Sequence, residues 1–272
     1  MVFVDPMPDE ALLQEYNSRY FNNAHGGIQT HPLTVAFHSG INLLRVLYVN
    51  RFLAVKKFPV HKILEIGPGG GHFARHWMKI NKQTVQYTGV ESDKSCYEKL
   101  ISSNVDVFLT VDEIPAEREF DLVVISHVLE HTDKPSAFIE HCTRGLRKGG
   151  LLFIEVPCND YQHKPTVEPH LLFFDKEPMS FFLRKHGFNI GNISYYGNTI
   201  VDLTKPTSFL EKMYSKARNF LLSRGVVFPF AWHEPGLEGL ENGLERACVK
   251  PFNAHKEQTE PSWWLRVIAI KN

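Results

Sequence analysis

A glycine-rich turn between a short apolar strand and a helix most limits how this chain can fold. Lys62–Ile66 reads as a strand, residues 67–71 spell GPGGG, and a helix is predicted from His72 to about residue 80. Glycine allows backbone conformations that side chains disfavour, and it lets a ligand approach the N–H groups at the helix start. The turn therefore predicts a binding site, with a tight turn that holds no ligand as the alternative.

Strands and helices alternate on both sides of this turn. Further strands are predicted at 85–90, 105–111, 121–126, 151–156, 188–196 and 263–270, with helices at 94–102, 134–146 and 176–187. Alternation of this kind predicts an α/β fold, with a doubly wound, seven-stranded sheet and helices on both faces. Ligands of such sheets bind outside the carboxyl ends of the strands, so the loops after these strands are the candidate site.

The pattern divides the chain into four parts. Residues 1–59 carry two helical patterns and are predicted to form a helical N-terminal arm. Residues 60–196 form the ligand-binding core, and 263–272 supply its final strand. Residues 197–262 lack the alternation, and a segment of this length between two strands is expected to be an inserted cap or lid.

Charge and cysteine content exclude several classes of protein. The chain has 30 basic and 30 acidic side chains among 272 residues, and residues 198–262 balance at eight of each. Without a basic stripe, no nucleic-acid partner and no membrane partner is expected. The four cysteines form no C-x-x-C pair, and the first residues do not resemble a signal peptide. These features predict free thiols and a cytoplasmic location.

Four motifs in order carry a family resemblance. They are LEIGPGGG, GVESD, FDLVVISHVLEH and LRKGGLLFIEVP, and the glycine turn reads E-x-G-x-G-x-G. Together they resemble the class I S-adenosylmethionine (SAM)-dependent methyltransferases, in the small-molecule group with a V-L-E-H stretch. The resemblance implies a Rossmann-like core and SAM as the cofactor. Two alternatives stay open. One is an NAD(P)-binding oxidoreductase, although His72 occupies the sixth position of the dinucleotide-binding pattern G-x-G-x-x-G, where glycine or alanine is expected. The other is a non-catalytic SAM-binding subunit.

The resemblance also assigns cofactor contacts. Glu65 and the glycine turn are expected beside the methionine part of SAM, Glu91 at the ribose hydroxyls and Asp112 near the adenine. The residues just past the fourth strand are expected to face the sulfonium. The expected cofactor-binding set is Glu65, Gly67, Gly69, Gly71, Glu91, Asp112, Ser126 and His127.

Three residues are candidates for catalysis. His170 follows the fifth strand and is the favoured general base, with Glu168 as the group that would orient its ring. His127 is the competing base. Related enzymes bind a divalent ion through Glu-x-x-Glu-His, but His127 occupies the first position of that pattern here, so no metal is expected. The predicted function is methyl transfer to an oxygen or nitrogen of a small polar metabolite, such as a sugar or natural-product intermediate.

Overall fold

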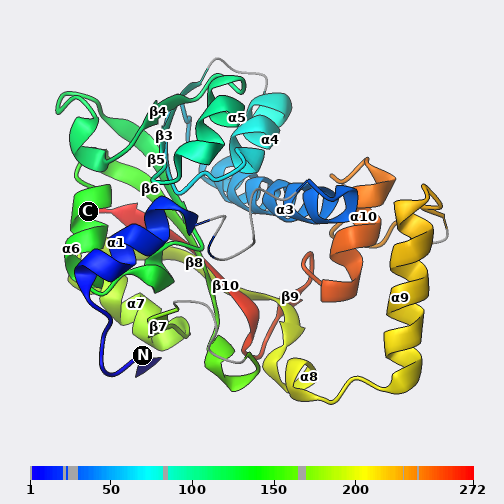
Figure 1. The fold of residues 1–272 in the computed structure, drawn as a ribbon. Helices are drawn as coiled ribbons and strands as arrows, with labels where there is room; N and C mark the ends of the chain where they lie inside the picture. The colour runs from blue at the N-terminus through cyan, green and yellow to red at the C-terminus, as the bar shows by residue number, and fades with distance from the viewer. Residues whose placement is uncertain are drawn as a thin grey trace.

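An eight-stranded sheet forms the centre of the computed structural model, with helices on both faces (Figure 1). The structure describes residues 2–20, 23, 30–81, 85–164, 170–228, 230–237 and 239–272. The strands of the central sheet are β2 (Lys62–Ile66), β3 (Gln86–Val90), β4 (Asp106–Phe108), β5 (Phe120–Ser126), β6 (Leu146–Pro157), β8 (Phe188–Thr199), β9 (Glu257–Gln258) and β10 (Ser262–Lys271).

The strand order is β4-β3-β2-β5-β6-β10-β8-β9. Strands β2 to β6 pair in parallel, whereas β10 runs antiparallel to both of its neighbours, β6 and β8. The predicted α/β, doubly wound Rossmann-like fold is therefore confirmed, and all seven predicted strands are present. The two-residue strand β9 was not predicted and adds an eighth strand at the edge beside β8.

Helices and short turns connect these strands. The helices are α1 (Glu10–Ser18), α3 (Pro32–Lys56), α4 (His72–Asn81), α5 (Tyr97–Ile101), α6 (Pro135–Cys142), α7 (Lys176–Lys185), α8 (Ile200–Thr204), α9 (Phe209–Ser223) and α10 (Gly243–Val249), with 3-10 turns η1 to η5 at Lys94–Cys96, Val111–Glu113, Leu129–His131, Asp160–Gln162 and Lys250–Phe252. α6 ends earlier than the predicted 134–146, because Leu146 and the residues after it pair with β5.

The core lies on both faces of the sheet, because successive side chains of a strand point to opposite faces. In β5, Val123 and Ile125 belong to one buried cluster, whereas Leu122 and Val124 belong to the other. The four cysteines are buried free thiols. Within the described ranges, no helix is both long and apolar enough to cross a membrane.

Several contacts join the described residues between 2 and 56 to the core. A short strand β1 (Val2–Phe3) pairs antiparallel with β7 (Leu172–Phe173) in a separate two-stranded sheet. Helix α3 packs against both α4 and α10, and Ser39 contacts His76 of the one and Glu245 of the other. The α3–α10 contact is close, since a Cβ on Gly40 would lie 2.6 Å from Val249 Cγ1 and 3.3 Å from the Glu245 carbonyl oxygen.

This contact predicts that Gly40→Ala destabilises the protein although alanine favours helices. The added methyl overpacks the α3–α10 contact, at a cost of about 1–3 kcal/mol, which exceeds the helix gain of roughly 0.5–1 kcal/mol. Urea unfolding measures the change. In a Val249→Ala background the same substitution should be neutral or stabilising, and a loss of equal size in both backgrounds would contradict the packing explanation.

Candidate active site

The glycine turn after β2 adopts the conformation that its sequence predicts. Gly67, Gly69 and Gly71 have φ of 69°, 51° and 69°, in the left-handed region that side chains rarely occupy. A Cβ on Gly67 would lie 2.5 Å from Val128 Cγ2, so the turn leaves no room for a side chain there. The turn is therefore fixed against the loop that follows β5.

Glu91, at the end of β3, is joined directly to this turn. One carboxylate oxygen accepts from the Gly69 backbone N–H at 2.9 Å, and the other accepts from the Asp93 N–H at 2.9 Å. The residue is 5% exposed, and burial raises its pKa. Each oxygen retains a second lone pair, so the carboxylate could still accept a ribose hydroxyl, as the sequence predicts.

Glu65 is the buried acidic group of β2. It accepts a hydrogen bond from the Tyr87 hydroxyl at 2.6 Å, and burial raises its pKa to about 7, against the opposing effects of Tyr87 and Arg45. A buried carboxyl poised near neutrality favours a cationic neighbour, because a positive charge would stabilise its ionised form. An amino-acid ammonium group fits this requirement.

Ser126 is the last residue of β5, the strand that pairs with β2 on the side away from β3. Its hydroxyl oxygen is buried and has no hydrogen-bond partner among the described residues. A buried polar atom left without a partner is uncommon, and it indicates a position that a ligand or water completes. The turn, the two buried carboxyls and this hydroxyl therefore fit a polar, partly cationic cofactor.

His127 lies between two buried carboxylates. Its Nε2 is 3.1 Å from Glu155 Oε1, and its Nδ1 is 3.3 Å from Glu130 Oε1. The residue has φ of 55°, a conformation that non-glycine residues seldom adopt and that often marks functional positions. Burial opposes its charged form, but the bonds to Glu130 and Glu155 outweigh burial and raise the pKa of His127. The imidazolium, which donates from both nitrogens, is thus the favoured form.

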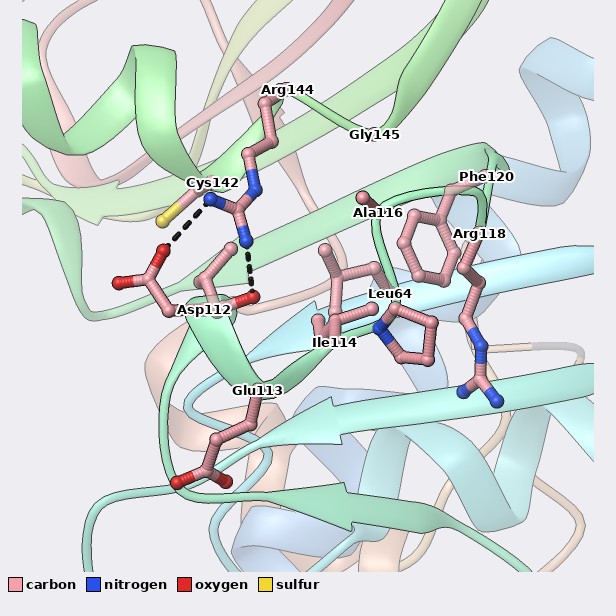
Figure 2. A pocket seen from close by; sticks show the side chains of 12 residues that line it. Leu64, Asp112, Glu113, Ile114, Ala116, Arg118, Phe120, Cys142, Arg144 and Gly145 are labelled. Atoms are coloured by element: carbon pink, nitrogen blue, oxygen red, sulfur yellow. Dashed lines mark hydrogen bonds and ion pairs between the residues drawn. The ribbon is translucent and has the colours of Figure 1, made fainter.

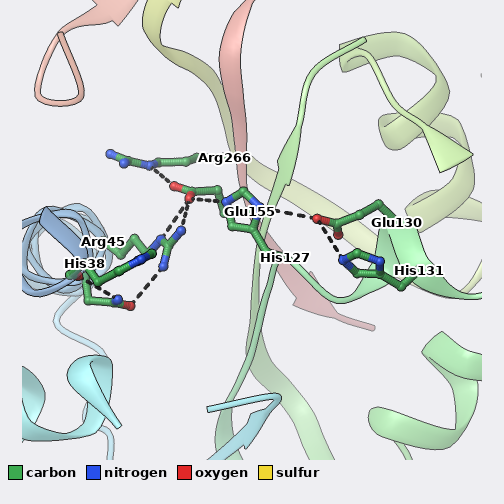
Figure 3. A network of polar contacts seen from close by, with 8 residues as sticks. His38, Arg45, His127, Glu130, His131, Glu155 and Arg266 are labelled. Carbon is green, nitrogen blue, oxygen red and sulfur yellow. Dashed lines mark hydrogen bonds and ion pairs between the residues drawn. The ribbon is translucent and has the colours of Figure 1, made fainter. Parts of the chain in front are cut away.

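Glu155 in β6 is the centre of this network (Figure 3). Arg45 of α3 donates to its Oε1 from Nε at 2.8 Å, and Arg266 of β10 donates to its Oε2. The Arg266 guanidinium also lies 4.2 Å from the centre of the Tyr196 ring. Burial alone would raise the pKa of Glu155, but the two arginines hold it well below its ordinary value. The carboxylate is therefore ionised at neutral pH.

His170 is brought to the same region by the loop after β6. Its Nδ1 is 2.7 Å from Asp160 Oδ2, and its ring lies 4.9 Å from that of His131, edge to face. Tyr20 of the N-terminal segment also contacts His131, with ring centres 5.6 Å apart. Glu168, the predicted partner of His170, lies outside the described residues. Asp160 is the carboxylate that the structure places on this ring.

Glu130, His131 and His170 form a compact group of metal-ligand types. One donor atom from each lies within 4.8 Å of the others, and all three residues are buried. One carboxylate and two imidazoles suit a divalent transition metal and leave coordination positions open. The sequence analysis expects no metal, and this cluster is where the described residues could hold one.

Asp112 is exposed in the turn η2 that follows β4. Its carboxylate accepts from Arg144 at 2.8 Å and lies 3.4 Å from His141 Nε2. It lines a groove of about 640 Å³ between residues 111–118 and the end of α6 (Figure 2). None of the other predicted site residues lines this groove. The adenine contact of Asp112 stays a prediction.

Four residues of the histidine network were not predicted from the sequence: Glu155 and Asp160, which contact the histidines, and Arg45 and Arg266, which contact Glu155. A single charged residue interrupts an apolar run at Arg45, Glu155 and Arg266. This pattern could have predicted that the three residues are buried together. Such charges are almost never fully buried unless they are paired. Asp160 carried no comparable signal, because it lies in an irregular loop ten positions before His170.

Comparison with known proteins gives the class of this site. The sequence model of the family described as "Methyltransferase domain" matches residues 44–190, more than half of the chain. The chain belongs to this family and is a class I SAM-dependent methyltransferase. SAM is its cofactor, and this removes the nicotinamide alternative. The glycine turn, Glu65, Glu91 and the Ser126 hydroxyl fit that cofactor.

Individual relatives agree at the level of the domain. The chain is 30% identical over 106 residues to a ubiquinone biosynthesis O-methyltransferase of Parvibaculum lavamentivorans, covering 37% of this chain and 42% of the relative. It is 29% identical over 127 residues to the enzyme of the same name from Glaesserella parasuis, covering 42% and 52%. The matches thus span about half the length of these relatives.

Solved structures extend the likeness over the whole fold. The plantazolicin methyltransferase BamL, in complex with a triazolic desmethylPZN analog and SAH, aligns over 97% of this chain and 99% of its own, with a TM-score of 0.56 and 13% identity. A putative sarcosine dimethylglycine methyltransferase from Galdieria sulphuraria aligns over 84% and 85%, with a TM-score of 0.51 and 18% identity. At such identities the likeness concerns the fold.

The geometry of Glu91 predicts a specific loss of cofactor affinity. Glu91→Ala should weaken SAM binding by roughly 1.5–3 kcal/mol, because hydrogen bonds from a charged acceptor would be lost. Isothermal titration with SAM and with its demethylated product measures the change. Glu98→Ala, an exposed glutamate of α5, is the matched control and should bind normally. Unchanged affinity in a folded Glu91 variant would place the ribose elsewhere.

The arginine contacts of Glu155 predict a loss of stability that depends on pH. Glu155→Gln leaves two buried guanidiniums without their counter-charge, at a cost of about 3–5 kcal/mol at neutral pH. Because the folded pKa is depressed, this contribution is present above the unfolded pKa of about 4.3 and is lost as pH falls. Denaturation from pH 7 to pH 3 should therefore show a shallower acid loss in the variant, and parallel curves would contradict this role.

Proposed function

We propose that this enzyme transfers the methyl group of SAM to a hydroxyl oxygen of a small polar metabolite, such as a sugar or natural-product intermediate. Transfer to an amine nitrogen is the alternative within the same reaction class. The observation that carries the choice of oxygen is the Asp160–His170 pair, because a hydroxyl gains from a general base, whereas an amine needs only to arrive unprotonated.

The geometry of the pair defines its role in the proposal. Asp160 accepts the Nδ1 proton of His170, which fixes the neutral ring in the tautomer with its lone pair on Nε2. Nε2 would take the hydroxyl proton as the oxygen attacks. SAM supplies the electrophilic methyl group, and the chain supplies position and exclusion of water. The burial of both side chains, at 3% and 7% exposure, suits that exclusion.

His127 is less suited to be the base. Both of its nitrogens face carboxylates, which raise its pKa and accept from both ring nitrogens of the protonated form, so neither nitrogen is turned toward an acceptor substrate. We assign it to positioning, since the imidazolium connects Glu155 with Glu130 and so with the group around His170. His170 is therefore the favoured base, because Asp160 contacts its Nδ1, whereas both nitrogens of His127 face carboxylates.

Two curated relatives support the choice of acceptor. The relatives from Parvibaculum lavamentivorans and Glaesserella parasuis both carry the name ubiquinone biosynthesis O-methyltransferase. The segment between β8 and β10 is proposed as the acceptor cap, as the sequence predicts for 197–262. Its helix α10 packs on α3, where Ser39 donates to Glu245 at 2.7 Å, and α3 also carries Arg45 of the histidine network.

The proposal predicts different outcomes for the two histidines. His170→Ala should lower turnover of a hydroxyl acceptor by about 10²–10⁴-fold with little change in SAM affinity. Asp160→Asn should lower turnover as well, since an amide no longer fixes the active tautomer. Radiolabelled SAM with a panel of hydroxyl and amine metabolites measures the transfer. A fully active His170 variant beside an inactive, SAM-binding His127 variant would reverse the assignment.

Two controls separate the alternatives. Wild-type turnover that survives chelation supports His170 as a base, whereas turnover that needs added divalent metal makes the same residue a ligand and overturns the proposal. A purified chain that binds SAM and methylates none of the panel would support the non-catalytic alternative.

A further inference from the structure

Helix α9 exposes an apolar face to solvent, with only the ring of Tyr214 packed against another described aromatic ring, that of Phe230. Apolar residues recur along the helix at intervals of four and then seven residues, which places them on one side of it. One such row is Phe209, Met213 and Phe220, and the neighbouring row is Leu210, Tyr214 and Leu221. Both Phe209 and Leu210 are about three quarters exposed, at 74% and 76%. These six side chains, with the exposed Val226, Phe228 and Trp232 that follow the helix, are here called the α9 face.

The opposite side of α9 attaches the helix to the protein. Leu222 is 2% exposed, and Arg218 donates to the Ala247 carbonyl oxygen of α10. Figure 1 shows α9 at the edge of the molecule beside α10, far from the central sheet. An apolar face of this extent on one side of an anchored surface helix indicates an interaction site, since single exposed apolar residues are normal but contiguous ones are not.

The charge around the α9 face is positive although the chain is neutral overall. Residues 202–224 contain five basic side chains (Lys205, Lys212, Lys216, Arg218 and Arg224) and two acidic side chains, Asp202 and Glu211, of which Asp202 pairs with Lys205 at 2.7 Å. Lys212 and Lys216 are exposed and form no ion pair with a described residue. The acidic residues that balance them, such as Glu234 and Glu245, lie farther along the chain. The balance of eight and eight over 198–262 therefore hides a separation of charge along the sequence.

We propose that α9 docks this methyltransferase on the surface of a lipid bilayer that carries anionic headgroups. Apolar and aromatic side chains on one side of a helix, with lysines at the border, are the composition of helices that lie in the bilayer interface. Tyrosine and tryptophan favour this region, and Tyr214 and Trp232 supply them. The proposal does not depend on the acceptor or on the general base, and it replaces the expectation of no membrane partner.

The same charges disfavour a second copy of the chain as the occupant. In a two-fold interface the same surface of each copy meets its equivalent, so the basic borders would come together. Like charges brought close repel, whereas anionic headgroups neutralise them. Self-association is therefore the alternative that the experiment must distinguish.

Vesicle binding by the full chain tests the proposal. The enzyme should sediment with phosphatidylcholine vesicles that contain phosphatidylglycerol, bind phosphatidylcholine alone more weakly, and dissociate as salt rises. Trp232 reports insertion, because it is 58% exposed whereas Trp77 and Trp264 are buried and Trp263 is half-buried and stacked on Trp264. Its emission should shift to shorter wavelength with anionic vesicles. Trp232→Phe should remove most of the shift while retaining sedimentation.

Surface variants give the contrast. Leu210→Ser with Met213→Ser should weaken vesicle binding by at least about tenfold, or about 1.4 kcal/mol, because two apolar side chains no longer leave water on binding. Lys212→Glu with Lys216→Glu should lower binding to anionic vesicles at least about tenfold and leave binding to neutral vesicles unchanged. Phe181→Ser is the matched control, because Phe181 of α7 is 72% exposed and lies outside the α9 face.

Three outcomes would overturn the proposal. The wild-type chain could fail to bind either vesicle, the Phe181 variant could lose as much binding as the α9 double variant, or the serine variants could convert a dimer to a monomer by light scattering without affecting vesicles. Unchanged circular dichroism, thermal unfolding and SAM affinity confirm that each variant is folded, so loss of binding reports on the surface alone.

Discussion

The ionised carboxylate of Glu155 is the constraint on which the site depends. It is fully buried in β6, and only its contacts with Arg45, Arg266 and His127 make the buried charge tolerable. A buried ion pair contributes little net stability against an apolar replacement, but an incomplete one is strongly destabilising. The carboxylate therefore requires α3 and β10 to lie where Arg45 and Arg266 can reach it. Once held there, it fixes the orientation of the His127 ring.

The sequence predicts those features that depend on neighbouring residues. The glycine turn, the strand–helix alternation and the acidic residue after β3 are local patterns, and the structure contains all of them. The insertion of β10 between β6 and β8 and the pairing of β1 with β7 depend on contacts between distant residues, which periodicity does not report. For the same reason Asp160 was missed as the partner of His170, whereas Glu168 was expected because it is a near neighbour in sequence.

Totals of charge were also a poor guide to surfaces. A neutral sum over a long segment predicts no membrane partner, whereas the proposed membrane contact is inferred from the spacing of residues in α9, which places apolar groups on one side and lysines beside them. The information was present in the helical period rather than in the composition. Conversely, burial of a single charge is unfavourable at each of positions 45, 155 and 266 taken alone. It becomes tolerable because the three charges neutralise one another.

The place of β10 in the sheet has a consequence for how the polypeptide is made. Synthesis proceeds from the N-terminus, so β6 and β8 leave the ribosome before the strand that separates them. Until residues 262–271 arrive, β8 has no hydrogen-bonded neighbour in the main body of the sheet, and Glu155 lacks one of its two arginines. The nascent enzyme would thus have an unpaired strand edge and an incompletely neutralised carboxylate. A chain in this state is prone to aggregation, which chaperones prevent.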